Sequence, residues 1–403
     1  MPVIAPWLAA VALSAALPDA ATDPPLAWTP AVPVAHGDVL PRSVGQPGTL
    51  YVNFDGAVLQ DGCGNDAHRD CSALGNLFDG YVGPFDGTDV QRVAILQAAR
   101  KDVADFGIRI VTKRPPDEDE YTMILYGALG DQEFAGIAPY IDCGDLWPSD
   151  TAFANAYSTS NTGSTVILQE AAHTWGLEHV DAPFDNMHPF KTGGSQSFTD
   201  ECQKIVSNTD LDSYGGACNA VHQRFCERGY QNSWQELRYL FGPPVPDTSP
   251  PTLTITNPED GAEFALPVTI PLTGVIDDDL DPQAYTITVL KDGAKVFEDE
   301  GLSLALLMND PPAGEYDLTV QVTDEAGNLG TSRVRFTIYP EGTVLPDDQD
   351  DGEADSGCRI DGEAGEAGLG LLVLGLVRRR RRRPDGATQH WRRRCERAKT
   401  GGP

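Results

Sequence analysis

Basic residues are scarce over most of this chain. Its 403 residues include 29 Lys and Arg against 60 Asp and Glu, which gives a formal net charge of -31. Eleven of the basic residues lie between Arg378 and the C-terminus, so residues 1–377 carry 18 basic against 58 acidic side chains. This composition argues against nucleic acid as a partner of residues 1–377, because its phosphates would be repelled.

The chain also lacks any C-x-x-C pair, which argues against a thiolate zinc site. Of its eight cysteines, six fall between residues 47 and 242: Cys63, Cys71, Cys143, Cys202, Cys218 and Cys226. An even number of cysteines in an exported domain predicts three disulfides. Short sequence separations favour Cys63 with Cys71 and Cys218 with Cys226. The third pair is then Cys143 with Cys202.

No Lys or Arg occurs near the N-terminus, yet residues 4–17 are an apolar stretch that ends just before small residues at 19–21. This pattern predicts that residues 1–22 are a secretory signal whose positive charge is the α-amine alone. A buried helix is the alternative, and the Asp and Pro residues that follow make it the weaker interpretation. Residues 23–46 form a lead that is rich in Pro and Ala and contains no cysteine.

The most informative segment is residues 169–179, which read Q-E-A-A-H-T-W-G-L-E-H. On a helix, Gln169 and His173 lie one above the other, so two side chains at these positions can share a metal ion. Glu170 flanks that pair and can hold a water molecule for attack. A glycine lets the chain leave the helix in a left-handed turn, which directs His179 back toward the metal. Three protein ligands and an open fourth position are typical of catalytic zinc sites.

The segment resembles the metzincin zinc-peptidase signature H-E-x-x-H-x-x-G-x-x-H. The positions that match are Glu170, His173, Gly176 and His179, and the position that differs is Gln169.

Met187 supplies a second point of resemblance. It lies eight residues after His179 and two residues before Pro189. This arrangement is similar to the Met-turn of the matrixin branch of the metzincins, in which a methionine packs beneath the metal. The resemblance covers about residues 47–242. It implies a mixed sheet with an active-site helix, a bound Zn²⁺ ion, Glu170 as general base, and a protein or peptide substrate.

Gln169 departs from the family pattern, because an amide oxygen replaces an imidazole nitrogen and zinc favours His, Cys and carboxylate ligands. Three interpretations follow. The zinc site is weaker, with Gln169 as a ligand or as a neighbour bridged by water; the site recruits His188 or His222; or the site is inactive and kept as a scaffold. An amphipathic core helix with two incidental histidines leaves the glycine and the methionine unexplained. The presence of Glu170 favours an active peptidase.

Residues 47–242 are expected to form an α+β domain. Apolar runs and alternation predict strands, and apolar residues at helical spacing predict helices. The expected order is a strand at 49–54, a helix at 89–106, strands at 108–111, 121–126 and 151–157, the active-site helix, and two closing helices at 198–206 and 234–241. We expect the strand at 151–157 to be the edge strand along which a substrate peptide binds.

Residues 243–249 are a linker rich in Pro. Between 250 and 340, short strands at regular spacing predict an all-β Ig-like sandwich. Residues 314–328 resemble the last hairpin of bacterial Ig-like domains, which implies a spacer or anchor. The acidic run at 277–279, together with Asp281, can hold Ca²⁺ through its carboxylates. A solvated acidic loop is the alternative.

Residues 341–357 are acidic and rich in Gly, which predicts disorder. In residues 358–383, Cys358 precedes an apolar patch at 367–377 and six arginines. This order resembles the C-terminal sorting segment of myxobacterial surface proteins. That resemblance implies transient membrane association and transfer to the cell surface of a Gram-negative bacterium. The patch is short against the ~20 residues of a membrane-spanning helix, and residues 384–403 extend beyond the pattern as a basic tail.

Two hypotheses follow. The first is an exported, surface-associated zinc endopeptidase with Gln169, His173 and His179 at the metal and Glu170 as general base. The second is a catalytically inactive metzincin-like protein that serves in binding or adhesion. Stoichiometric zinc in the purified protein favours the first.

Overall fold

The protein is described from a computed structural model. The described residues are 8–10, 44–60, 64–130, 134–157, 159–190, 196–207, 211–213 and 215–345. Several expected features therefore lie outside them: Cys63, the sorting segment with Cys358, the basic tail, and nearly all of the signal, the lead and the acidic linker.

A five-stranded sheet forms the centre of residues 47–242. Its strand order is β5-β2-β6-β8-β7, and β7 alone runs antiparallel to its neighbour. The bounds are β2 (Gly48–Asn53), β5 (Ile108–Val111), β6 (Thr122–Gly127), β7 (Gly136–Ile137) and β8 (Thr151–Asn155).

Both faces of this sheet are buried. Ile124 and Tyr126 of β6 belong to one hydrophobic cluster, whereas Met123 and Leu125 belong to another. Successive side chains of a strand point to opposite faces, so the sheet separates two cores. A continuous apolar run is what a parallel strand buried on both sides requires.

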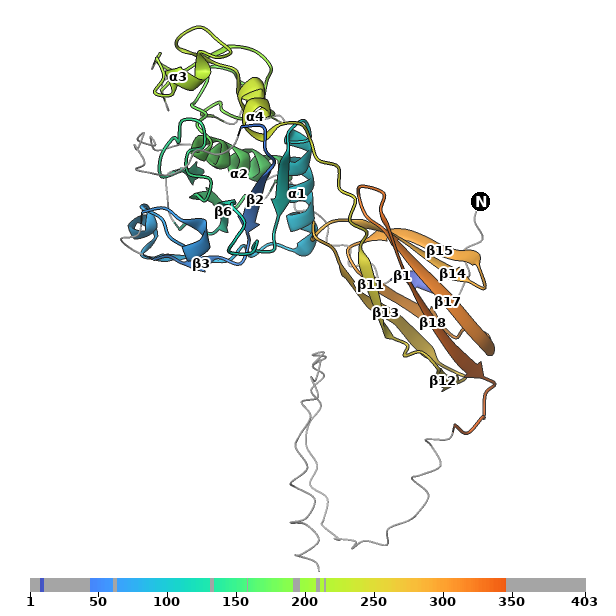
Figure 1. Ribbon diagram of the computed structural model, residues 1–403. Helices are drawn as coiled ribbons and strands as arrows, with labels where there is room; N and C mark the ends of the chain where they lie inside the picture. The colour runs from blue at the N-terminus through green and yellow to red at the C-terminus, as the bar shows by residue number, and fades with distance from the viewer. Residues whose placement is uncertain are drawn as a thin grey trace, which may run out of the picture. The chain divides into compact units, whose positions relative to one another are not determined.

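Two helices cover one face of the sheet (Figure 1). Helix α1 (Asp89–Asp102) begins with a capping box in which Thr88 accepts from the Gln91 amide and the Gln91 side chain accepts from the Thr88 amide. Helix α2 (Ser160–Thr174) packs against α1 and against β6 and β8. The opposite face is covered by residues 57–60 and 64–82, which include Leu59, Phe78 and Val82.

The expectation that residues 151–157 form the edge strand is wrong. Strand β8 lies between β6 and β7, and β7 occupies the edge through pairs such as Gly136 with Ala154. A strand of two residues is too short to produce an alternation that sequence analysis can detect.

The rest of this region consists of short elements: β3 (Ala57–Val58), β4 (Tyr81–Val82), the 3-10 turns η1 (Ala67–Arg69) and η2 (Gly75–Phe78), β9 (Gln203–Lys204), α3 (Asn219–His222), β10 (Tyr230–Gln231) and α4 (Ser233–Phe241). Helix α4 agrees with the helix expected at 234–241. The helix expected at 198–206 is wrong, because part of that segment is β9, which pairs with β10.

Residues 252–339, together with β1 (Leu8–Ala10), form a β-sandwich of two sheets, ordered β1-β16-β13-β11 and β12-β18-β17-β14-β15. Its core alternates along the strands, as Tyr316, Leu318, Val320 and Val322 of β17 show. The strand bounds are β11 (Thr252–Asn257), β12 (Ala262–Ala265), β13 (Thr269–Asp277), β14 (Tyr285–Lys291), β15 (Ala294–Gly301), β16 (Leu304–Asn309), β17 (Gly314–Thr323) and β18 (Leu329–Tyr339).

The short strand β1 (Leu8–Ala10) pairs antiparallel with β16. It falls within the segment expected to be a secretory signal. Among the described residues, no helix is long and apolar enough to span a membrane.

Two disulfides join Cys143 to Cys218 and Cys202 to Cys226, so the expected pairs Cys218–Cys226 and Cys143–Cys202 are wrong. From Cys218 to Cys226 the chain makes helical turns, with the His222 amide bound to the Cys218 carbonyl and the Cys226 amide to the His222 carbonyl. Two helical turns separate those cysteines by about 11 Å, beyond the ~7 Å that a disulfide spans between Cα atoms. Cys71 is disulfide-bonded.

Removing the Cys143–Cys218 bridge is expected to destabilise the protein more than removing Cys202–Cys226. The first closes a loop of 75 residues and the second a loop of 24. Loop entropy therefore predicts losses of about 4 and about 3 kcal/mol in the free energy of unfolding. Denaturant titration of the two Cys→Ser double variants measures both values. A smaller loss for the Cys143–Cys218 variant would contradict this prediction.

Candidate metal centre

Helix α2 carries three of the four expected site residues into the core. Gln169, Glu170 and His173 are 2%, 0% and 0% exposed. Gln169 and His173 are four residues apart and so lie on the same side of the helix. The buried position of all three polar side chains is unusual for a helix that only packs against a sheet, because buried polar groups need partners.

The structure brings His173 and His179 together. Their Nε2 atoms are 3.2 Å apart, and the rings meet edge to face. Zinc–nitrogen bonds of about 2.0–2.1 Å in a tetrahedral site place two ligand nitrogens about 3.4 Å apart. The two imidazoles therefore have the spacing of two neighbouring zinc ligands.

A hydrogen bond fixes the orientation of His173. Its Nδ1 lies 2.8 Å from the carbonyl oxygen of Leu177, which can only accept, so Nδ1 carries the proton and Nε2 presents a lone pair. Burial lowers the pKa of His173 to about 4. The imidazole is therefore neutral at pH 7, as a metal ligand must be.

Gly176 ends α2 with a φ of +102°, which only glycine adopts readily. A side chain would also collide there, because a Cβ would lie 2.7 Å from the Asp142 carbonyl oxygen and from the Gly144 nitrogen. This close contact turns the chain toward His179. The role expected for the glycine in the sequence pattern agrees with this geometry.

Gln169 makes contacts that sequence analysis did not foresee. Its Nε2 donates to the carbonyl oxygens of Asn186 (3.0 Å) and His188 (2.9 Å). These carbonyls flank Met187, which is fully buried. The Gln169 amide thus joins α2 to the turn around Met187 through its Nε2, and these two hydrogen bonds do not use its Oε1.

Glu170 lies against the edge strand. A Cβ added to Gly136 of β7 would come within 2.5 Å of the Glu170 Cγ and 2.6 Å of its Oε1. The carboxylate therefore fills the space that a side chain at residue 136 would take. Because Glu170 directly follows Gln169 in α2, its carboxylate lies beside the side of the helix that carries Gln169 and His173.

The two alternative histidines are not part of this pair. Both ring nitrogens of His222 contact carboxylates, Nδ1 with Glu236 at 2.9 Å and Nε2 with Glu178 at 3.2 Å. His188 Nδ1 bonds to the Phe190 backbone. These contacts do not support the interpretation in which the metal site recruits His222.

Among the described residues, two groups of His, Cys, Asp or Glu bring three ligand atoms within 4.8 Å of one another. One consists of Glu178, Cys218 and His222, but Cys218 is in a disulfide and has no thiolate to offer. The other consists of Asp247, Asp278 and Asp279. Neither includes the pair His173 and His179.

Glu178, His222 and Glu236 form a buried chain of hydrogen bonds next to His179. Glu178 Oε1 also accepts from the Ala217 and Cys218 amides, at 2.5 and 2.8 Å. Because Glu178 directly precedes His179, these bonds hold the segment that carries the second imidazole. Sequence analysis missed this group, since its members are separated by 44 and 14 residues.

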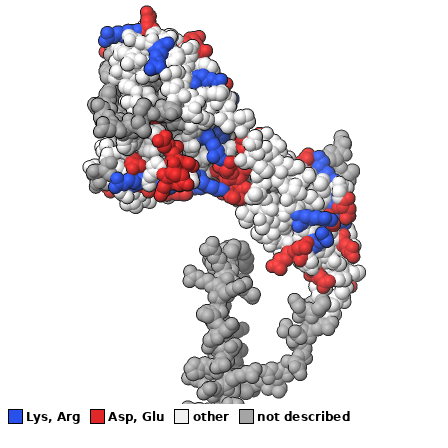
Figure 2. Space-filling model, viewed as in Figure 1, with Lys and Arg blue, Asp and Glu red and all other residues white. Residues whose placement is uncertain are grey.

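The face drawn in Figure 2 carries groups of acidic side chains with basic side chains beside them. This surface agrees with the low content of basic residues in the sequence.

No family model and no curated protein matches the chain. Among solved structures, the chain is similar to fibronectin(III)-like modules of CbhA from Clostridium thermocellum, at 16% identity over 26% of this chain and 55% of that chain, with a TM-score of 0.22. This chain therefore spans about half the length of that structure. It is also similar to the PKD domain from the KIAA 1837 protein, at 21% identity over 21% of this chain and 86% of that one, with a TM-score of 0.16.

The protonation of His222 makes stability depend on pH. Burial alone would lower the pKa of His222, but the hydrogen bonds that its ring donates to the Glu178 and Glu236 carboxylates raise it to about 9. The ordinary value is 6.5, so this stabilisation is complete below about pH 6.5 and is lost as the pH rises through about 9. We expect the free energy of unfolding to fall by on the order of 3 kcal/mol over that window.

Chemical unfolding at a series of pH values tests this expectation, with His222→Gln and His68→Gln compared with the parent. His68 lies in η1, away from the buried chain. The loss above pH 6.5 should persist in His68→Gln and disappear in His222→Gln. A flat profile for the parent protein would contradict the charged state of His222.

Proposed function

We propose that the chain is an exported, zinc-dependent endopeptidase of the metzincin type. The observation that carries the proposal is the 3.2 Å separation of His173 Nε2 and His179 Nε2, with His173 Nδ1 held by a carbonyl oxygen. Two buried imidazoles facing each other gain little from that contact unless a shared proton or metal lies between them. The motif around them favours the metal.

Zinc would be held by His173, His179 and the Oε1 of Gln169, and when bound it would acidify a water molecule and polarise a peptide carbonyl. Gln169 fits this role only as a neutral oxygen ligand, because its Nε2 already donates to the Asn186 and His188 carbonyls. The neutral oxygen predicts weaker zinc binding than a third imidazole gives.

Glu170 would accept the proton of the attacking water and return it to the leaving amine. Its carboxylate lies against Gly136. Strand β7, which has no neighbour on its outer side among the described strands, would therefore offer that edge to an extended substrate peptide, with main-chain hydrogen bonds placing the scissile bond near the carboxylate. In this proposal the substrate binds beside β7 and not beside β8.

A catalytically inactive binding or adhesion protein is the second candidate. Its support comes from Gln169 and Glu170. The Gln169 amide closes the gap between α2 and the Met187 turn without a metal, and Glu170 is fully buried. A degenerate metzincin-like scaffold followed by a β-sandwich would have this arrangement.

The sequence pattern at the N-terminus and the disulfides support a location outside the cytoplasm. Cys143–Cys218 and Cys202–Cys226 suit an oxidising compartment. The substrate class is protein or peptide, and the proposal involves no nucleic acid.

Metal content and a charge-neutral variant test the catalytic role. Protein purified without added metal should contain one zinc per chain, and Glu170→Gln should keep that zinc while turnover of a generic protein substrate falls by about 10²- to 10⁴-fold. Glu227→Gln, at an exposed position, is the matched control and should cleave at the parent rate. Zinc-free protein without cleavage would support the second candidate. Cleavage by Glu170→Gln at the parent rate would assign the base elsewhere.

Gln169→His should raise zinc affinity by more than about tenfold and increase cleavage, because it restores a third imidazole. The same variant loses two hydrogen bonds to the Met187 turn, so without metal it should be less stable by about 1–2 kcal/mol. Titration with a zinc chelator measures the affinity, and Gln169→Ala, which loses the hydrogen bonds without gaining a ligand, is the control. Equal zinc retention by the parent and Gln169→His would show that residue 169 does not touch the metal.

A further inference from the structure

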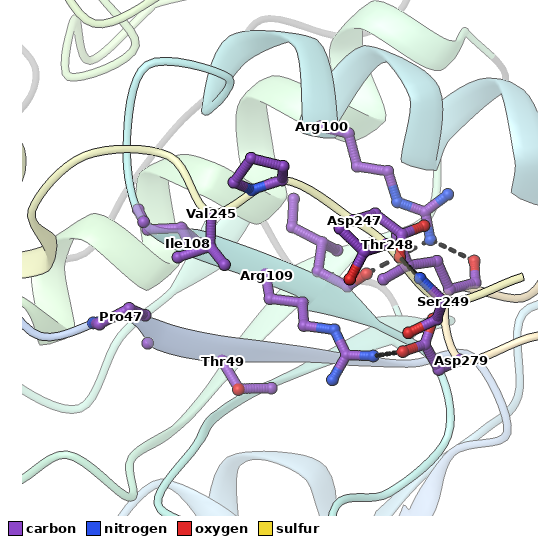
Figure 3. Close-up of a pocket in the computed structure, with 15 residues that line it drawn as sticks. Pro47, Thr49, Arg100, Ile108, Arg109, Val245, Asp247, Thr248, Ser249 and Asp279 are labelled. Carbon is purple, nitrogen blue, oxygen red and sulfur yellow. Dashed lines mark hydrogen bonds and ion pairs between the residues drawn. The ribbon is translucent and has the colours of Figure 1, made fainter. Parts of the chain in front are cut away.

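The second group of carboxylates lies where the linker meets the β-sandwich. Asp247 belongs to the linker, and Asp278 and Asp279 follow β13. One ligand oxygen from each lies within 4.8 Å of the others. Figure 3 shows Asp247 and Asp279 on the wall of a pocket that Arg100 and Arg109 also line.

Two oxygens of this group are buried without a hydrogen bond among the described residues. Asp278 is 5% exposed, and its Oδ1 accepts from the Leu280 amide and the Gln283 side chain, both at 2.8 Å, whereas its Oδ2 has no partner. Asp247 Oδ1 accepts from the Ser249 amide at 2.9 Å, and Asp247 Oδ2 has no partner. In native structures a buried carboxylate oxygen normally accepts a hydrogen bond, which offsets the free energy of removing it from water. These two oxygens accept none among the described residues.

One nearby cationic side chain already contacts this group, because Arg109 pairs with the Oδ2 of Asp279. The other cationic side chains contact different atoms. Arg100 donates to the carbonyl oxygens of Leu280 and Ile110, at 2.5 and 3.3 Å.

Lys113 contacts Asp277, the main-chain carbonyl of Asp278 and, at 3.8 Å, Asp281. Asp277 and Asp281, both expected from the sequence to join a calcium site, are thereby paired with Lys113. Asp281 also accepts from the Tyr285 hydroxyl and the Asp278 amide.

The dimensions suit calcium. Ca²⁺ takes six to eight oxygen ligands at about 2.3–2.6 Å, so oxygens on opposite sides of the ion are separated by about 5 Å. Three carboxylates within 4.8 Å of one another fit around one such ion. Main-chain carbonyls and water can complete the shell.

We propose that Asp247, Asp278 and Asp279 bind one Ca²⁺ ion and that this ion fixes the linker to the sandwich. The linker already touches the sandwich at one point, where the Asn328 side-chain amide lies 3.4 Å from the Asp247 carbonyl oxygen. The ion would join the same segment to the end of β13. This site does not depend on the zinc centre.

Calorimetric titration of the full chain with CaCl₂, together with thermal unfolding in calcium and in magnesium, tests the site. The parent should bind one Ca²⁺ with a Kd of about 10⁻⁴ to 10⁻³ M, the range of extracellular modules. Asp278→Asn keeps the Oδ1 acceptor and should weaken binding by more than about tenfold. Asp279→Asn, which changes an exposed residue, should do the same without a loss of fold.

Asp299→Asn, on an exposed part of β15, is the matched control and should bind calcium as the parent does. No calcium binding by the parent would overturn the proposal. The negative charge of the three carboxylates would then be balanced by Arg100 and Arg109. Equal binding by the parent, Asp278→Asn and Asp279→Asn would also overturn it, by placing the ion elsewhere in the chain. An equal rise in Tm with magnesium would indicate general screening of charge and would count against a built site.

Discussion

The left-handed turn at Gly176 is the constraint on which the candidate metal centre depends. It brings the Leu177 carbonyl back to the Nδ1 of His173 and carries the chain on to His179. Both imidazoles are therefore oriented by the same turn. The turn is itself held by close contact with residues 142–144, and the Cys143–Cys218 bridge anchors that segment. A covalent bond between distant parts of the chain thus supports a backbone conformation that few residues adopt.

Gln169 has a structural role that is separate from its proposed role as a zinc ligand. Through two hydrogen bonds it joins α2 to the carbonyls beside Met187. The helix and the turn therefore stay together whether or not a cation is present. The buried chain of Glu178, His222 and Glu236 acts in the same sense, because it fixes the residue next to His179 through side chains alone. The residues of the candidate site are thus held in place by hydrogen bonds within the protein.

The parts of the molecule that could be predicted from sequence are those with local signals. The i, i+4 spacing of Gln169 and His173, the glycine that ends the helix, and the alternation along β17 all depend on neighbours within a few residues. The disulfide pairs, the β7 edge and the His222 network depend on contacts between distant segments. The residues that make these contacts have no characteristic spacing in the sequence. Asp247 was missed for the same reason, since its two carboxylate neighbours lie 31 and 32 residues further along the chain.

The packing of Gly136 against Glu170 links two positions that are far apart in the sequence. A carboxylate on the helix requires an empty Cβ position on the strand, because even a methyl group at residue 136 would lie within 2.6 Å of the acid. The converse does not hold, since a shorter side chain at 170 would leave room for alanine or serine at 136. A side chain at residue 136 therefore requires a shorter or displaced side chain at residue 170, whereas glycine at 136 is compatible with either.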